Sequence, residues 1–150
     1  MADTPALLAM AFRVIMDQVH ESLAAQGFAD VRPAHGFAFQ YLSLHPAATA
    51  VDLGQHLGVT KQAAVQLVDE LQRRGYVERG PHPTDRRSRV IALTPRGWAC
   101  VQRVVELWAA MESRWADLIG ADRLDLLRDD LARLIADGAG GQPVALRPVW

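Results

Sequence analysis

Several features are scarce or missing in this chain of 150 residues. Its single cysteine, Cys100, cannot form an intramolecular disulfide, which fits a reducing compartment. No stretch approaches the roughly 18 uncharged residues that a membrane-spanning helix needs. The apolar stretch Leu7–Met16 lacks a basic N-terminal flank and contains Arg13, so it is not expected to be a secretory signal. These absences predict a cytoplasmic protein with no membrane partner.

Patterns typical of metal sites and of catalysis are also missing. The histidines have neither H-x-x-x-H spacing nor a cysteine pair beside them; they are His20, His35, His45, His56 and His82. The serines lack the context of a catalytic nucleophile, and no base lies near Cys100 in the sequence. We therefore predict no metal, no cofactor and no enzymatic activity.

What is present is the composition of a folded protein, with half of the residues hydrophobic and 22% charged. The net charge is −1, but it is unevenly distributed. Between residues 51 and 93, seven Lys and Arg stand against five Asp and Glu, a net of +2; the remainder has nine against twelve, a net of −3. A solvated surface loop would give the same distribution, so charge alone leaves a nucleic-acid partner open.

Apolar residues at helical spacing predict two helices in the N-terminal third. The first covers residues 5–26 and ends at Gly27, and its apolar positions are Leu7, Leu8, Ala11, Phe12, Ile15, Val19 and Leu23. The second begins at Pro33, a residue suited to the first helical position, and runs to about Leu44.

The next two helices are short and close together. Thr49 caps a predicted helix over residues 50–56 that Gly58 ends, and Thr60 caps a second over residues 61–74. A short helix, a tight turn and a second helix make a helix-turn-helix. In the second helix Ala64, Leu67, Val68 and Leu71 are expected to face the core.

The outward face of that second helix suits a DNA major groove. Glutamine pairs bidentately with adenine, and small apolar groups contact thymine methyls. An exposed Val65 on a polar face fits a groove better than it fits a plain surface helix. The candidate DNA-contacting residues are Thr60, Lys61, Gln62, Ala63, Val65, Gln66 and Arg73.

After this helix the apolar residues no longer recur at helical spacing. Residues 77–80 and 88–93 are short β-rich runs, and the loop between them is rich in turn-forming residues. We expect a hairpin. Thr94 and Pro95 then open a long helix to about Ile119, and a last helix covers residues 122–136, followed by a glycine linker and the tail 143–150.

Apolar stripes on the terminal helices are too extensive for a small helix-turn-helix to cover. They include Trp98, Val101, Val105, Trp108, Met111, Trp115 and Leu118 in the long helix, and Leu124, Leu127, Leu131, Leu134 and Ile135 in the last. A second copy of the chain would bury them, which predicts a homodimer. The alternative is that the stripes pack within one chain.

The central residues resemble the MarR family of regulators. The segment 59–79 is similar to the family's recognition helix and the start of its wing, and Asp85–Thr94 is similar to its Asp-x-Arg wing followed by a strand ending in Leu-Thr. The resemblance covers about residues 36–135. It implies a mainly α (α+β) fold, with a winged helix-turn-helix domain (33–97) that has a two- or three-stranded β-wing. Helical regions at 5–32 and 98–150 would form the dimerisation domain.

The resemblance also implies roles for the wing. Arg87 would enter the DNA minor groove, where negative potential concentrates, and Asp85 would hold its guanidinium by a charge-assisted pair. Arg86 and Arg89 would contact DNA beside it. The alternative is that the Asp85–Arg87 pair only tightens the hairpin. Gln66 departs from the family, where arginine or another DNA-contacting polar residue is common, so no base preference is transferred.

By the same resemblance, the chain is a repressor that responds to a small aromatic or phenolic ligand and binds a pseudo-palindromic double-stranded DNA operator. Candidate ligand residues are Arg13, His35, Phe39, Tyr41 and Trp98, which could equally be ordinary core and surface groups. The alternative function is a protein-interaction or small-ligand-binding module without DNA binding. Arg87, Lys61 and the outward glutamines favour DNA.

Overall fold

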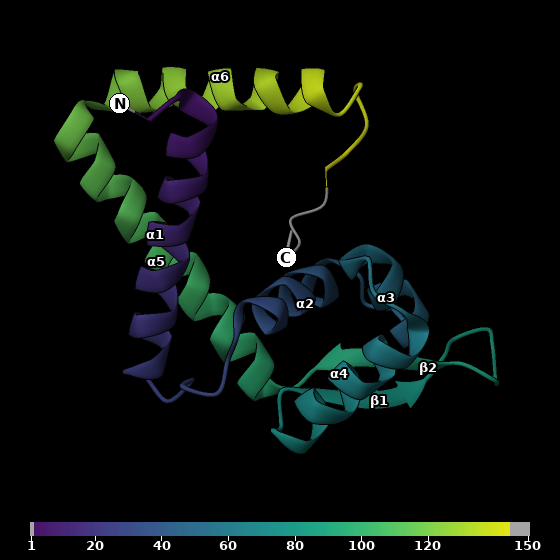
Figure 1. The fold of residues 1–150 in the computed structure, drawn as a ribbon. Helices are drawn as coiled ribbons and strands as arrows, with labels where there is room; N and C mark the ends of the chain where they lie inside the picture. The colour runs from purple at the N-terminus through teal and green to yellow at the C-terminus, as the bar shows by residue number, and fades with distance from the viewer. Residues whose placement is uncertain (1, 145–150) are drawn as a thin grey trace. The chain divides into compact units, whose positions relative to one another are not determined.

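The computed structural model describes residues 2–144, which form six helices and a two-stranded sheet (Figure 1). The elements are, in chain order, α1 (Thr4–Ala24), α2 (Pro33–Leu44), α3 (Ala50–Leu57), α4 (Lys61–Arg73), β1 (Val77–Pro81), β2 (Arg89–Leu93), α5 (Pro95–Ile119) and α6 (Ala121–Gly138). Within the described residues they divide into two compact units, a winged unit of residues 2–104 and a helical unit of residues 105–144. Among residues 2–144, no helix has the length and apolar character needed to cross a membrane.

Local sequence explains where the helices of the winged unit begin and end. The side chain of Thr49 accepts a hydrogen bond from the Asp52 N–H, and the Asp52 carboxylate accepts one from the Thr49 N–H. Thr60 caps α4 by accepting from the Ala63 N–H at 3.1 Å. Gly58 ends α3 with φ of 69°, a left-handed conformation that favours glycine. The caps expected at Thr49, Gly58 and Thr60 are confirmed.

The sheet is an antiparallel hairpin with β1 and β2 paired from Val77↔Leu93 to Pro81↔Arg89. The Ile91 N–H of β2 donates to the Ala48 carbonyl at 2.8 Å, which ties the hairpin to the segment between α2 and α3. Ala48 is buried. Of the two- or three-stranded wing that was expected, the described residues form two strands.

Tyr76 lies at the centre of the core of the winged unit. Its ring is fully buried and packs against Phe39 with ring centroids 5.2 Å apart. Its hydroxyl donates to Asp30 at 2.6 Å and accepts from Arg96 at 3.0 Å. Burial and the Asp30 hydrogen bond raise the pKa of Tyr76 to about 12. One side chain therefore joins the segment after α1 to the hairpin and the start of α5.

The helical unit contains the part of α5 after Val104 and the whole of α6. Gly120, with φ of 94°, separates the two helices. Arg128 of α6 donates to Glu112 of α5 at 3.2 Å and to Asp125 at 2.7 Å. Among the described residues of this unit, the buried apolar side chains are Met111 and Leu124. Its other large apolar side chains are mostly exposed.

The predicted fold class is confirmed as mainly helical with a winged helix-turn-helix. Several helix ends differ by one or two residues, as in α6, which begins at Ala121 and ends at Gly138. Such ends are the least certain part of any helix. The domain division 5–32, 33–97 and 98–150 stays a prediction, and residues 145–150 of it lie outside the described residues.

Candidate nucleic-acid interface

Helices α3 and α4 of the helix-turn-helix approach each other closely because Gly54, which lies at their contact, has no side chain. A Cβ added at Gly54 of α3 would meet the Ala64 Cβ of α4 at 3.0 Å. Ala64, Val68 and Leu71 are buried against the core. Their burial sets which face of α4 turns outward.

The outward face of α4 carries the residues that the sequence predicted for DNA contact. Thr60, Lys61, Gln62, Gln66 and Arg73 are exposed. Ala63 and Val65 are partly exposed between them. This face combines hydrogen-bonding amides, positive charge and small apolar groups, which is the chemistry that reads base edges in a major groove.

An ion pair that was not predicted from the sequence joins α4 to the wing. The Arg79 guanidinium of β1 donates to the Asp69 carboxylate at 2.6 Å and also to the Gln72 side chain. Asp69 is half-exposed, and Arg79 is less so. The pair neutralises the acidic group on the outward face of α4 and links that helix to the first strand.

The wing loop between β1 and β2 projects beyond the strands (Figure 1). Asp85 in this loop accepts from the Arg87 N–H at 2.9 Å and from the Ser88 hydroxyl at 2.8 Å. These hydrogen bonds lower the pKa of Asp85. The family resemblance implied an ion pair with the Arg87 guanidinium instead. Within residues 2–144 the structure has no such pair, because the backbone and Ser88 occupy the carboxylate.

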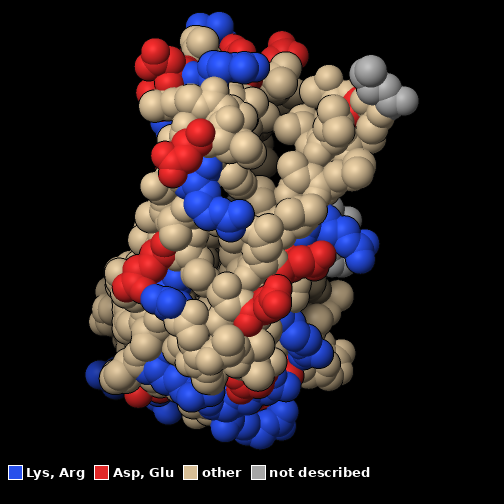
Figure 2. All heavy atoms as spheres, turned by 90° about the vertical axis from the view of Figure 1, so that its left-hand side faces the viewer, with Lys and Arg blue, Asp and Glu red and all other residues tan. Residues whose placement is uncertain are grey.

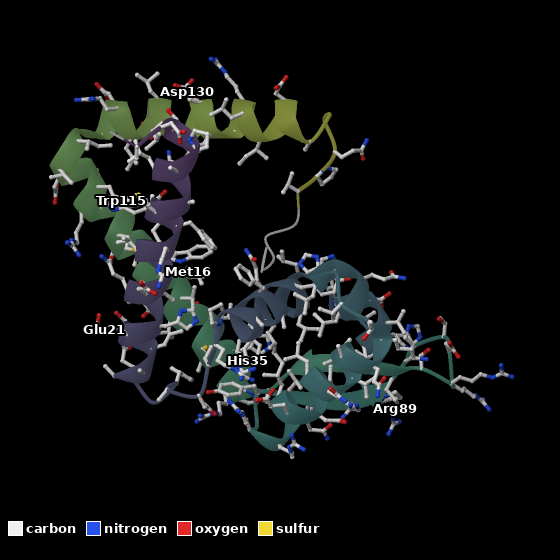
Figure 3. All side chains as sticks on the ribbon, viewed as in Figure 1. Met16, Glu21, His35, Arg89, Trp115 and Asp130 are labelled. Atoms are coloured by element: carbon white, nitrogen blue, oxygen red, sulfur yellow. The ribbon has the colours of Figure 1, made fainter. Side chains whose placement is uncertain are left out.

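Five basic side chains border this surface without a carboxylate partner among the described residues. They are Lys61 and Arg73 of α4 and Arg86, Arg87 and Arg89 of the wing, all exposed. Figure 3 shows Arg89 where β2 leaves the wing loop. In Figure 2, Lys and Arg gather at the lower end of the view. Unpaired cations of this kind are suited to phosphate contacts.

The candidate ligand residues have separate surroundings. His35 is buried in the winged unit (Figure 3), where it accepts from the Arg32 N–H at 3.1 Å and lies 3.7 Å from the Glu70 carboxylate. Burial lowers the pKa of His35, although Glu70 opposes the shift. Phe39 packs on Tyr76. No hydrogen bond or ring contact joins any two of the five candidates within residues 2–144.

The other three ligand candidates are more accessible. Tyr41 lies between the rings of His45 and His56, with centroids 4.0 and 4.3 Å away. Arg13 and Trp98 are exposed. Among the described residues no group of three or more His, Cys, Asp or Glu side chains could hold a metal.

Two features of the interface were not predicted from the sequence. The Asp69–Arg79 pair spans ten positions, and no local pattern marks it. His82 was treated as one scattered histidine, yet its Nδ1 accepts from the N–H groups of Thr84 and Asp85. Its place among turn-forming residues, two and three positions before those N–H groups, is the signal that could have found it.

Part of this chain is similar to a known protein family. Residues 29–88 match the model of the MarR family. An uncharacterized protein of Mycobacterium tuberculosis is 30% identical over 89 residues, which are 59% of this chain and 62% of that protein. The chain therefore spans less than two thirds of the length of this curated relative.

Solved structures share the fold. The transcriptional repressor CouR, bound to a 23-mer DNA duplex, is 27% identical with a TM-score of 0.69, covering 88% of this chain and 92% of CouR. MepR of Staphylococcus aureus, a transcription regulator of the multidrug efflux pump MepA, is 18% identical with a TM-score of 0.73, covering 91% of this chain and 98% of MepR. At that identity the likeness to MepR concerns the fold alone.

Proposed function

Because residues 29–88 match the model of the MarR family and the repressor CouR shares the fold, we propose that this chain is a DNA-binding transcription regulator of the MarR type. The observation that carries the proposal is the set of unpaired cations around the outward face of α4 and the wing. The nearby acids cancel only part of this charge: Asp69 is paired with Arg79, and Asp85 keeps its negative charge because its hydrogen bonds in the wing lower its pKa. The family is one of non-enzymatic regulators, in line with the expectation that the chain is not an enzyme.

In this proposal α4 enters a major groove and the wing an adjacent minor groove. Gln62 and Gln66 would select bases, because an amide pairs bidentately with adenine. Arg87 would add affinity through the negative potential of a narrow, A·T-rich minor groove. Thr60, Lys61, Ala63, Val65 and Arg73 on α4 and Asp85, Arg86 and Arg89 in the wing complete the proposed interface.

The proposed assembly is a homodimer. Large apolar side chains stay exposed on α1 and in the helical unit, such as Met10 (58%) and Leu118 (81%). Large exposed apolar side chains in such number favour a protein interface. A dimer would present two copies of α4 about one helical turn of DNA apart, ~34–36 Å, which suits a pseudo-palindromic site.

We further propose repression relieved by a small aromatic or phenolic ligand, with Arg13, His35, Phe39, Tyr41 and Trp98 as its candidate contacts. This part rests on the family resemblance. Arg13 and Trp98 are the candidates that expose the most surface to an incoming anion or ring. The protein would act in the cytoplasm, with its DNA.

The test is a DNA titration at several salt concentrations with operator and scrambled duplexes, the operator taken from the chain's own upstream region. Arg87→Ala should weaken binding to both duplexes and lower the salt slope by about one unit. Gln66→Ala should keep the slope and relax discrimination by about 1–3 kcal/mol at one position per half-site. Arg133→Ala is the matched control, since it removes an exposed arginine from α6.

The outcomes separate the proposal from its alternatives. If wild type binds no duplex, the chain is a protein-interaction or small-ligand-binding module. If Arg87→Ala binds like Arg133→Ala at every salt concentration, the wing does not enter the groove. Adding benzoate as a probe tests the ligand: release of operator supports it, and unchanged affinity up to millimolar benzoate argues against a small aromatic anion.

A further inference from the structure

The wing turn is held by one histidine nitrogen. His82 directly follows β1 and is half-buried, unlike the exposed residues 83–87 that follow it. Its Nδ1 accepts hydrogen bonds from the backbone N–H of Thr84 at 3.2 Å and of Asp85 at 3.0 Å. Asparagine and aspartate side chains commonly hold the N–H groups of a turn in this way. Here an imidazole takes that role.

The two hydrogen bonds accepted by His82 Nδ1 depend on where the ring carries its proton. An imidazole nitrogen accepts a hydrogen bond only while it carries no proton. Both bonds therefore require the neutral ring with its proton on Nε2. A proton on Nδ1 would turn the acceptor into a donor that faces two other donors, and both bonds would be lost.

Asp85 links the part of the turn held by His82 to the backbone of Arg87. The Asp85 N–H is held by His82, and the Asp85 carboxylate in turn accepts from the Arg87 N–H and the Ser88 hydroxyl. Hydrogen bonds thus run from His82 through Asp85 to the backbone of Arg87.

We propose that His82 is a positioning residue of the wing, whose neutral imidazole closes the turn and thereby directs Arg87. Its relevance to DNA rests on the proposed function. A protonated ring releases the N–H groups of Thr84 and Asp85. It is also attracted to the Asp85 carboxylate, which stays ionised in mild acid, and so competes with the Arg87 N–H and the Ser88 hydroxyl for it.

The first experiment measures the turn without DNA, by NMR on the ¹⁵N-labelled full chain. Two other histidines serve as internal controls, because Nδ1 of His20 lies 2.7 Å from the Met16 carbonyl and Nδ1 of His45 lies 2.8 Å from the Tyr41 carbonyl. A nitrogen beside a carbonyl carries the proton. At pH 8 we expect the Nε2–H tautomer for His82 and the Nδ1–H tautomer for His20 and His45.

Acidification to about pH 5, below the usual range of histidine titration, should shift the backbone amide signals of Thr84 and Asp85 together with the His82 ring. In His82→Asn the carboxamide Oδ1 replaces Nδ1 as a pH-independent acceptor, so these two signals should stay in place. The proposal is overturned if His82 has the Nδ1–H tautomer at pH 8, or if the two amides respond alike in both proteins.

The second experiment measures operator binding at pH 8. His82→Ala removes the acceptor and should weaken binding about fivefold, the factor that corresponds to the usual loss of stability when a capping acceptor is removed. His82→Asn should restore affinity to within about twofold of wild type, because amide and imidazole acceptors are equivalent here. Equal weakening by both substitutions, or none by His82→Ala, contradicts a positioning role. If wild type binds no operator, the proposed function fails, and the NMR measurement alone decides whether His82 holds the turn.

Discussion

The winged unit and the helical unit bury their apolar residues to very different extents. Among the described residues, every buried apolar side chain except Met111 and Leu124 lies in the winged unit. The helical unit instead exposes a long series, namely Val105, Trp108, Trp115, Leu118, Leu126, Leu127, Leu134, Ile135 and Val144. The winged unit has a core of its own. The helical unit buries few apolar side chains of its own.

Phe39→Ala should have the largest effect, because it opens a cavity beside Tyr76 in that core. The Phe39 side chain is 2% exposed, and truncation of a buried phenylalanine costs about 3–5 kcal/mol. Urea unfolding followed by circular dichroism measures the loss. Leu118→Ala is the control. Because Leu118 is 81% exposed within one chain, this substitution should lower the free energy of unfolding of a monomer far less. Equal losses of the free energy of unfolding in the two variants would contradict the difference in apolar burial between the winged unit and the helical unit.

Leu134→Asp tests whether the exposed face of α6 is buried by a second copy. Leu134 is 59% exposed within one chain, so the substitution should leave the monomer fold intact. A homodimer interface would bury an unpaired carboxylate from each copy, and self-association should weaken about 100-fold. Sedimentation equilibrium measures the dissociation constant. An unchanged constant would place the interface elsewhere, and a monomeric wild type would contradict the homodimer.

Cys100 tests how well the core of the winged unit excludes solvent. Burial raises the pKa of this thiol from 9.0 to about 11. At pH 8 its thiolate fraction, and with it the rate of reaction with a thiol reagent, should be about 100-fold lower in the fold than in denaturant. Since the raised pKa disfavours the thiolate, its contribution to stability is present below pH 9 and is lost as the pH rises toward 11. Rapid labelling of native protein at pH 8 would contradict this.

Asp69→Asn should have the smallest effect on folding, because its ion pair with Arg79 is partly exposed. Such pairs contribute about 0–1 kcal/mol to the free energy of unfolding. A double-mutant cycle with Arg79→Gln isolates the coupling between α4 and β1. A coupling above about 2 kcal/mol would mean that the helix and the wing depend on each other more than their core contacts require.

Much of the fold was predictable because its determinants are local. Thr49, Gly58 and Thr60 act within three or four residues of their own positions, through caps that depend only on the neighbouring backbone. The spacing of Ala64, Val68 and Leu71 likewise decides which face of α4 is buried. A hairpin between two β-rich runs follows from the loop that separates them.

The sequence by itself therefore determined the order of the elements, the helix-turn-helix with its wing, and the outward face of α4. Only the tertiary structure decided which polar groups meet across the chain. The hydrogen bond of Tyr76 to Asp30 spans 46 positions, and the contact of Arg32 with Glu70 spans 38. In the wing, Asp85 could have bonded either a guanidinium or a backbone N–H, and the path of the loop placed it on the backbone. The physical reason is that periodicity and capping act over a few residues, whereas these partners come together only when distant segments pack.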